Sequence, residues 1–254
     1  YTMTEGRSPQ KVQITLRTEG PKDKVYRRTA STGGSSFTPS SDGKQLAFIM
    51  RGDVYVTSVE HGTTKRITQS AGAEESVTWS PDSKTLVYDS RRDGKHILYK
   101  ATIASDKELD FASATIIKEE PLMPECKMEQ ALPQYSPDGK QIALTLRGEV
   151  FVTSADYNTT KQITHTPAAE TGICFSPDNR TLAYASERGG NWQLYLAKIA
   201  RKEEANFPNA TIIEEEVLLP SKTVERNYPQ FSPDGKELAF IEDRMRLMVV
   251  NLET

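Results

Sequence analysis

The sequence predicts an all-β protein: a β-propeller of four-stranded antiparallel blades, with about five to six blades in a complete or partial ring. Residues 37–132 align with 133–228 at a constant offset of 96 without a gap, and 44 of the 96 positions are identical. A Ser-(Pro/Ser)-Asp phrase recurs with its serine at 40, 80, 136, 176 and 232, so the spacing alternates between 40 and 56. Such periods are typical of propeller blades or helical arrays, and the β-rich composition between the phrases favours blades.

The strands of one unit can be read from its composition. The runs "KQLAFIMR" (44–51), "DVYVTSVE" (53–60) and "TTKRITQ" (63–69) are rich in β-branched and aromatic residues and are bounded by turn-forming residues. No window of ten or more residues shows a 3.6-residue period, although 105–114 and 201–210 are compatible with a brief helical turn. Each unit is therefore predicted to be a meander, with one strand into the phrase, one out of it and two more.

The repeated phrase, as in "YSPDGKQIAL" from Tyr135, suits a tight hairpin. Proline presets φ at the second turn position, aspartate hydrogen-bonds its own backbone, and glycine accepts a positive φ. The aromatic residue before the phrase and the apolar residues after it are expected to pack between neighbouring blades. The alternative is that the aspartates bind calcium or a substrate. Because the same aspartate recurs in the same local setting in every copy, the scaffolding interpretation is favoured.

The repeats divide the chain into four parts. Residues 1–36 are predicted to be a partial blade, with third and fourth strands in 12–29, and 37–132 to be two blades. Residues 133–228 are the duplicate two blades, and 229–254 start a further blade that ends at its third strand, "RLMVVNLET". Either flanking sequence completes a six- or seven-bladed ring, or the two ends meet in one shared blade. Because propellers protect their sheet edges, we expect the polypeptide to continue past Thr254.

The composition limits the classes of partner. Lys and Arg total 32 against 35 Asp and Glu, which gives a net charge of −3 and a pI near 5.8, so neither nucleic acid nor an anionic membrane is an expected partner. No apolar run reaches the roughly 18 residues that span a bilayer. The start shows neither an initiator Met nor a signal peptide, as in a processed or excised chain. The oligomeric state is not predicted.

The sequence contains no recognisable catalytic, metal or cofactor motif. Its three histidines, His61, His96 and His165, do not lie in a motif that pairs a nucleophile with a base. Cys126 and Cys174 occupy unmatched repeat positions and are interpreted as isolated packing thiols. We therefore expect no catalytic residues, no metal ligands and no cofactor in this chain.

A family resemblance is found in two segments of the sequence, "RGDVYVTSVEHGTTKRIT" (51–68) and "RGEVFVTSADYNTTKQIT" (147–164). With the repeated phrase, they resemble the WD-like propeller repeats of TolB and of tricorn-type proteases. The Arg-Gly-(Asp/Glu)-Val element is most similar to the propellers of tricorn-like members of the C-terminal-processing serine protease group. In those proteases, as the resemblance implies, the catalytic serine lies in a separate domain of the same polypeptide.

The resemblance implies two functions. The first is a noncatalytic propeller that binds or guides peptide substrates to a protease domain outside this chain, so that the full-length protein would be a serine protease. The second is a TolB-like protein–protein interaction module without a protease. The resemblance also implies a bacterial protein that is periplasmic or otherwise exported, with the cytoplasm as the alternative.

One end of each predicted blade gathers charged residues. The second hairpins carry Arg51, Arg92, Arg147 and Arg188, and the links between blades carry Glu74, Glu75, Glu129, Glu170 and Glu225. The favoured interpretation is a set of arginine–glutamate bridges that tie each link to a neighbouring hairpin, worth ~0 to 1 kcal/mol each where exposed. The alternative is a peptide-binding rim in which the arginines hold peptide carboxylates. The insertions 104–115 and 200–211 are expected at the opposite end, beside the Ser-Pro-Asp turns.

Overall fold

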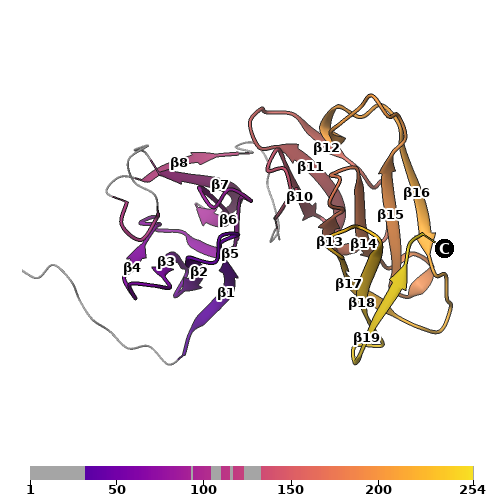
Figure 1. Cartoon of the computed structure of the whole chain (residues 1–254), viewed down its shortest axis with the longest axis horizontal. Helices are drawn as coiled ribbons and strands as arrows, with labels where there is room; N and C mark the ends of the chain where they lie inside the picture. The colour runs from indigo at the N-terminus through magenta and orange to yellow at the C-terminus, as the bar shows by residue number, and fades with distance from the viewer. Residues whose placement is uncertain (1–31, 93, 104–109, 115–116, 123–132, 254) are drawn as a thin grey trace, which may run out of the picture. The chain divides into compact units, whose positions relative to one another are not determined.

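Antiparallel strands make up the regular structure of this chain, as the computed structural model shows (Figure 1). The structure describes residues 32–92, 94–103, 110–114, 117–122 and 133–253. Within these ranges there is no α-helix, only two short 3-10 turns, Arg188–Gly190 (η1) and Phe207–Asn209 (η2). The prediction of an all-β propeller fold is confirmed.

Five sheets follow one another along the chain, and each pairs its strands in sequence order. The first contains β1 (Gly34–Pro39), β2 (Gln45–Met50), β3 (Asp53–Ser58) and β4 (Thr64–Arg66). The second contains β5 (Ala73–Trp79), β6 (Thr85–Arg92), β7 (Lys95–Ile103) and β8 (Ile117–Pro121). The third contains β9 (Gln134–Tyr135), β10 (Gln141–Leu146), β11 (Glu149–Ser154) and β12 (Thr160–Gln162). The fourth contains β13 (Glu170–Phe175), β14 (Thr181–Ser186), β15 (Gln193–Ile199) and β16 (Ile213–Leu218), and the fifth contains β17 (Arg226–Phe231), β18 (Glu237–Glu242) and β19 (Arg246–Asn251).

The contacts divide the chain into Tyr1–Thr32 and Gly33–Thr254, and all five sheets belong to the second unit. The strands predicted in 12–29 lie outside the described residues. So do Lys107, Cys126, Glu129 and the rest of 123–132. The four-part division of the chain therefore stays a prediction.

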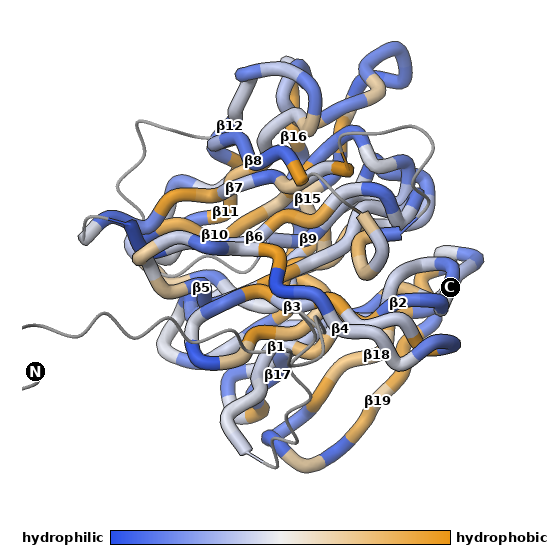
Figure 2. The backbone as a smooth tube through the Cα atoms, turned by 90° about the vertical axis from the view of Figure 1, so that its left-hand side faces the viewer, coloured by the Kyte–Doolittle hydropathy of each residue, from blue (hydrophilic) through white to orange (hydrophobic). Residues whose placement is uncertain are grey.

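The burial of each strand follows from its neighbours. β2 in the first sheet and β18 in the fifth bury alternate residues, as expected when one face of a sheet is covered. β6 and β14 bury runs of successive residues, because other sheets cover both of their faces. Figure 2 shows the hydropathy of the chain, with hydrophobic stretches along the strands and hydrophilic residues at many of the turns.

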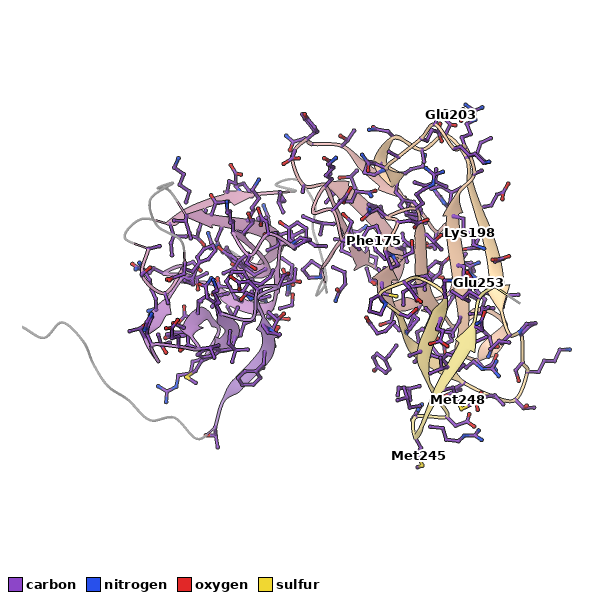
Figure 3. The ribbon with its side chains drawn as sticks, in the orientation of Figure 1. Phe175, Lys198, Glu203, Met245, Met248 and Glu253 are labelled. Atoms are coloured by element: carbon purple, nitrogen blue, oxygen red, sulfur yellow. The ribbon has the colours of Figure 1, made fainter. Side chains whose placement is uncertain are left out.

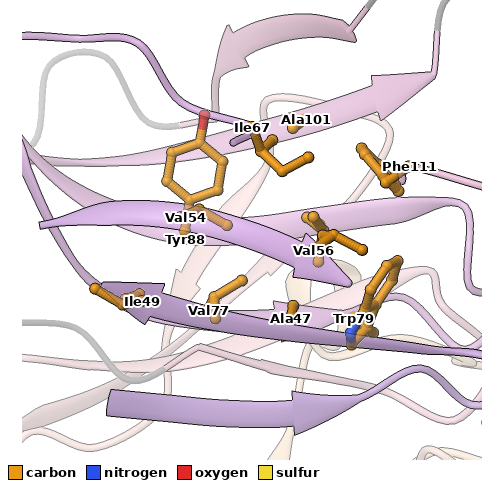
Figure 4. Close-up of a cluster of buried hydrophobic side chains, with 11 residues drawn as sticks. Ala47, Ile49, Val54, Val56, Ile67, Val77, Trp79, Tyr88, Ala101 and Phe111 are labelled. Carbon is orange, nitrogen blue, oxygen red and sulfur yellow. The ribbon is translucent and has the colours of Figure 1, made fainter. Parts of the chain in front are cut away.

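Apolar clusters fill the spaces between successive sheets. One joins the first two sheets and includes Val54, Val56, Trp79 and Phe111 (Figure 4). Its counterpart joins the third and fourth sheets. Two further clusters join the second sheet to the third and the fourth to the fifth. The β-branched and aromatic residues that predicted strands thus also form the cores between sheets.

The third hairpins of the second and fourth sheets fold back onto the preceding sheet. Phe207 of η2 is fully buried, and its backbone N–H donates to Gln141 Oε1 at 2.7 Å. Phe111 in the corresponding hairpin donates to Gln45 Oε1 at 2.8 Å. Each phenylalanine packs edge-on against the aromatic residue before a Ser-Pro-Asp turn, with ring centroids 5.5 Å (Trp79) and 6.2 Å (Phe175) away. The insertions that lengthen alternate repeats therefore seal alternate junctions between sheets.

β19 leaves apolar side chains in solvent. Met245 is 90% exposed and Leu247 is 71% exposed, and both lie in or beside this strand of a three-stranded sheet. Figure 3 labels Met245 at the tip of the hairpin and Met248 on the strand. A fourth strand on this edge is not among the described residues, so completion of this sheet stays a prediction.

Candidate functional site at the second hairpins

The Ser-Pro-Asp turns satisfy their own polar groups. Ser136 Oγ donates to Asp138 Oδ1 at 2.6 Å, and the same carboxylate oxygen accepts the backbone N–H of Lys140 at 3.1 Å. The other four copies repeat this serine–aspartate bond at 2.5 to 2.6 Å. In Asp42 and Asp234 these hydrogen bonds, led by the serine hydroxyl, lower the carboxyl pKa. Such closed local networks support the scaffolding interpretation.

The turns also join successive sheets. The backbone N–H of Asp42 donates to Ser83 Oγ at 3.2 Å, and that of Asp138 donates to Asn179 Oδ1 at 3.0 Å. Gly139 has a positive φ of 73° and lies so close to Pro81 that an added Cβ would be 3.3 Å from its ring. The glycine of the phrase thus permits both the turn and a close approach between neighbouring turns.

Open pockets lie at the junctions that no insertion seals. The larger, of about 590 Å³, lies between the fourth and fifth sheets, and its walls include Thr181, Lys198 and Asp234. Lys198 is labelled in Figure 3. The smaller, of about 400 Å³, lies between the second and third sheets and includes Thr85. Thr85 and Thr181 follow their turns at the position where Gln45 and Gln141 hold the phenylalanine insertions, so junction sealing alternates along the chain.

Arg92, at the end of β6, is held by groups of its own sheet. Its Nη2 lies 2.9 Å from Glu119 Oε1 of β8 and 3.8 Å from Glu74 Oε1 of β5, and its Nε donates to Ser90 Oγ at 2.9 Å. Its guanidinium carbon lies 3.8 Å from the centroid of the Tyr99 ring, in cation–π geometry. Burial lowers the pKa of Arg92, but the hydrogen bond and charge of Glu119 outweigh this and raise it. The contacts of Arg92 therefore hold its guanidinium group within its own sheet, as expected for a structural side chain.

Arg188 repeats the arrangement in the fourth sheet. It makes a bidentate ion pair with Glu215 of β16, with Nη2 to Oε1 at 2.8 Å, and its Nε lies 3.6 Å from Glu170. Its guanidinium carbon lies 4.3 Å from the Tyr195 ring centroid. The hydroxyl of Tyr184 also donates to Glu215. We call each set of arginine, two glutamates and two tyrosines a clamp: Arg92, Glu74, Glu119, Tyr88 and Tyr99, and Arg188, Glu170, Glu215, Tyr184 and Tyr195.

The inner glutamate of each clamp ties its sheet to the link before it. Glu74 accepts hydrogen bonds from Thr68 at 3.0 Å and from Ser70 and Ser90 at 2.9 Å each. The Thr68 hydroxyl in turn accepts the backbone N–H of Val54 in the preceding sheet at 3.0 Å. Burial raises the pKa of Glu74, although the three hydroxyls and Arg92 oppose the shift. The chain of bonds therefore crosses from the first sheet to the second.

Arg51 and Arg147 differ from the clamp arginines. They adopt left-handed conformations, with φ of 55° and 52°, in two-residue turns that each end in a positive-φ glycine. The turn backbone docks on the next sheet, where Gly52 O accepts the Glu74 N–H at 2.8 Å. Both arginines are exposed, and no group among the described residues pairs with their guanidinium groups. The four predicted rim arginines thus separate into two held and two free side chains.

The predicted arginine–glutamate bridges need correction. Glu74, Glu75 and Glu170 lie in the first strands β5 and β13 rather than in links. The arginines that pair with Glu74 and Glu170 belong to the same sheets as these glutamates. Glu225 precedes β17 and pairs with Arg244 at 3.4 Å, and Glu129 lies outside the described residues. The reason is that β5 begins at Ala73 and β13 at Glu170, so in these two sheets the chain has already entered its first strand at the glutamate.

The remaining titratable groups form no nucleophile–base pair within the described residues. His61 is exposed beside Glu60, and His165 is exposed in a loop. Burial raises the pKa of Cys174 to about 12, as expected for a packing thiol. His96 lies 3.0 Å from the buried Asp89, a contact that sequence reasoning missed. The sequence does contain a signal for this contact, because His96 and Asp89 both differ from their counterparts in the duplicate, Trp192 and Ala185.

No helix in the described part of the chain is long and apolar enough to cross a membrane.

The consecutive antiparallel meanders and their closed turns form a β-propeller fold. Residues 117–253 match the PD40 family, the TolB beta propeller domain, and the chain belongs to this family.

Known proteins resemble this chain in sequence and in fold. The Tol-Pal system protein TolB of Francisella tularensis subsp. mediasiatica (strain FSC147) is 26% identical over 175 residues, which are 66% of this chain and 35% of that protein. The chain therefore spans about a third of the length of this relative. A putative TolB from Agrobacterium tumefaciens superposes with a TM-score of 0.62 at 17% identity, covering 87% of this chain and 77% of that one.

The tricorn protease is also similar in fold. It superposes with a TM-score of 0.61 at 15% identity, covering 86% of this chain and 20% of that one. At this identity the likeness extends to the fold alone. The TolB part of the predicted resemblance is confirmed, and the narrower resemblance to tricorn-like processing proteases stays a prediction.

Proposed function

We propose that this chain is a noncatalytic interaction module that binds an acidic, extended segment of a protein partner through Arg51 and Arg147. The observation that carries this proposal is the separation of the four hairpin arginines. Arg92 and Arg188 pair with glutamates of their own sheets, and their guanidinium groups lie over tyrosine rings of the same sheets. Arg51 and Arg147 keep their guanidinium groups in solvent.

The chemistry of these two side chains suits a carboxylate ligand. A guanidinium group presents a planar fork of donors that matches a carboxylate in bidentate geometry. The docked turn backbone fixes the base of each arginine, because Gly52 O and Gly148 O accept N–H groups of the next sheet at 2.8 and 2.7 Å. Loops on a rigid scaffold are common recognition sites. The near-neutral net charge means that this attraction would be local.

The TolB-like interaction function is preferred over the protease-associated one. The family match and the curated TolB relative favour it, whereas the tricorn protease resembles this chain only in fold. The second candidate function is a propeller that guides peptides to a protease domain in the same polypeptide. The Arg-Gly-(Asp/Glu)-Val element favours this candidate. Sequence flanking these 254 residues discriminates the two, since a PDZ-like segment followed by a serine protease domain would support the second candidate.

We further propose an exported, periplasmic protein, because its curated relatives are TolB proteins of a Tol-Pal system. Fractionation of cells that express the full-length protein tests this. Recovery with cytoplasmic markers would contradict it.

A charge-matched pair of double variants tests the binding site. Fluorescence anisotropy with a library of labelled acidic peptides would compare the wild type with Arg51→Gln/Arg147→Gln and with Lys44→Gln/Lys140→Gln. The lysines are exposed, lie at the first hairpins at the other end of the same sheets, and share the 96-residue offset. Each exposed charge contact contributes at most about 1 kcal/mol, so the arginine pair should weaken binding by up to about thirtyfold.

The lysine pair should change binding little, and the affinity of the wild type should fall as salt rises. Unfolding by urea should be the same for all three proteins. Equal peptide affinities across the three proteins would contradict the proposed site, and so would an absence of binding.

A further inference from the structure

One polar cluster in the second sheet is not used by the turns, the clamps or the proposed peptide site. It contains Glu75, Asp89 and His96, whose ligand atoms all lie within 4.8 Å of one another. Asp89 is on β6 opposite Leu98 of β7, and His96 is two residues before Leu98, so both side chains lie on the same face of the sheet. Glu75 occupies the irregular position of β5, between Glu74 and Ser76, where the register with β6 shifts.

The cluster combines buried negative charge with access from solvent. The Asp89 side chain is fully buried, and its Oδ2 lies 3.0 Å from His96 Nδ1. The His96 side chain is 15% exposed, and Glu75 is partly exposed. A buried carboxylate is stable when it is paired with a cation or coordinates a metal. A cation can therefore reach this site from the side of His96 and Glu75.

The duplicate shows that the fold does not need this cluster. Thr171, Ala185 and Trp192 occupy the three positions at the 96-residue offset. Trp192 packs against an apolar cluster that includes Ala185, Leu194 and Phe240. All three polar ligands of the second sheet are thus replaced together in the fourth sheet, and two of the replacements, Ala185 and Trp192, belong to this apolar cluster. Because the fourth sheet packs without these three polar residues, propeller packing does not explain their presence in the second sheet.

We infer that Glu75, Asp89 and His96 form a binding site for a divalent transition-metal ion, with Zn²⁺ as the best-fitting candidate. Imidazole together with carboxylates suits zinc, and three protein ligands plus water are a common zinc coordination set. At zinc–ligand distances of about 2.1 Å, ligand atoms in a tetrahedron lie about 3.4 Å apart, compared with 3.0 Å between His96 Nδ1 and Asp89 Oδ2. The third ligand is the Glu75 carboxylate, which lies within 4.8 Å of the other two ligand atoms. Ca²⁺ fits less well, because it takes six to eight oxygen ligands.

The competing explanation is an ion pair between protonated His96 and Asp89 without a metal. Isothermal titration calorimetry of the 254-residue chain with ZnCl₂ distinguishes the two. We expect one equivalent of zinc to bind and His96→Gln to weaken the binding by at least tenfold. The matched controls are His61→Gln and His165→Gln, which replace the other two histidines and should leave the affinity unchanged. Titration with CaCl₂ should give weaker binding than zinc by tenfold or more.

A second variant guards against misfolding. Glu75→Thr/Asp89→Ala/His96→Trp carries the residues of the duplicate, so it should fold, as judged by circular dichroism, and should not bind zinc at this site. X-ray absorption of the zinc-loaded wild type should show mixed nitrogen and oxygen ligation. The inference is overturned if zinc does not bind, if His96→Gln binds it as the wild type does, or if calcium binds equally well.

Discussion

The second and fourth sheets are equivalent parts of the duplication, yet they agree in one region and differ in another. Both contain the arginine clamp, with the same residue types at the 96-residue offset and the same contacts. They differ on the face toward the following sheet, where the second sheet has Asp89 and His96 and the fourth sheet has Ala185 and Trp192 at the equivalent positions. The clamp crosses from β5 through β6 to β8, so its loss would affect a whole sheet. The other face tolerates either polar or apolar packing.

In this pair of sheets the identical residues form the clamp, and the divergent residues lie on a face that accepts different side chains. Identity between the copies does not separate the arginines, because Arg51 and Arg147 are repeated at the same offset as Arg92 and Arg188. Arg92 is the last residue of β6 and Arg188 is the first residue of η1 after β14, and both reach their clamps. Arg51 and Arg147 lie in two-residue turns and reach solvent. Residue type and hairpin position alone do not distinguish these two pairs.

The strongest test of equivalence between the copies is removal of the sealing phenylalanines. Phe111→Ala and Phe207→Ala each empty a fully buried site, and we expect each to lower the free energy of unfolding by about 3 to 5 kcal/mol. Urea denaturation followed by tryptophan fluorescence would measure both. Equal losses would confirm that the two insertions serve the same junction role. A loss below 1 kcal/mol in either would show that its insertion does not seal the junction.

The clamps predict a smaller loss. Arg92→Gln and Arg188→Gln each leave two glutamates without their guanidinium partner, and we expect a cost of about 2 kcal/mol, in the range for hydrogen bonds to charged groups. Chemical denaturation of these variants should be compared with that of Arg51→Gln, which should change stability by less than about 0.5 kcal/mol. Similar costs for Arg51→Gln and Arg92→Gln would remove the distinction between held and free arginines.

The turns predict a smaller cost again. Asp138→Ala removes the acceptor of the Ser136 hydroxyl and the Lys140 N–H, and by analogy with capping bonds it should cost about 0.5 to 2 kcal/mol. Thermal unfolding would measure it, and Asp178→Ala provides the equivalent change in the fourth sheet. Peptide binding should persist in both variants. If stability were unchanged while binding of a ligand or metal vanished, the turn aspartates would be a site rather than scaffold.

The smallest expected effect is a pH dependence at the first clamp. Because burial raises the pKa of Glu74 above its unfolded value, the folded state binds more protons, and stability falls as pH rises from about 4.5 through the folded pKa. Glu74→Gln cannot titrate, so its stability relative to the wild type should improve between pH 5 and pH 8 in urea denaturation. The exposed Glu60→Gln is the control. A constant difference between Glu74→Gln and the wild type would contradict the shift.

The sequence determined the architecture because the signals for it are local or periodic. Runs of β-branched and aromatic residues predicted β2 and β3, Ser-Pro-Asp-Gly predicted the first hairpins, and the 96-residue offset predicted the repetition of meanders. The alternation of 40 and 56 predicted insertions at third hairpins, where Phe207 and its η2 turn are found. Each of these features depends on backbone preference or on the period of burial, which neighbouring residues specify.

Only the tertiary structure decided which of the repeated polar side chains are held by partners from other strands. Arg188 meets Glu215 across 27 residues, Phe207 meets Gln141 across 66, and the sequence contains no local signal for either distance. The same holds for His96 and Asp89, which lie seven residues apart on paired strands and converge because β6 and β7 are in register. Sheet pairing and blade packing bring these groups together, so the fold could be predicted from local pattern while the held and free charges could not.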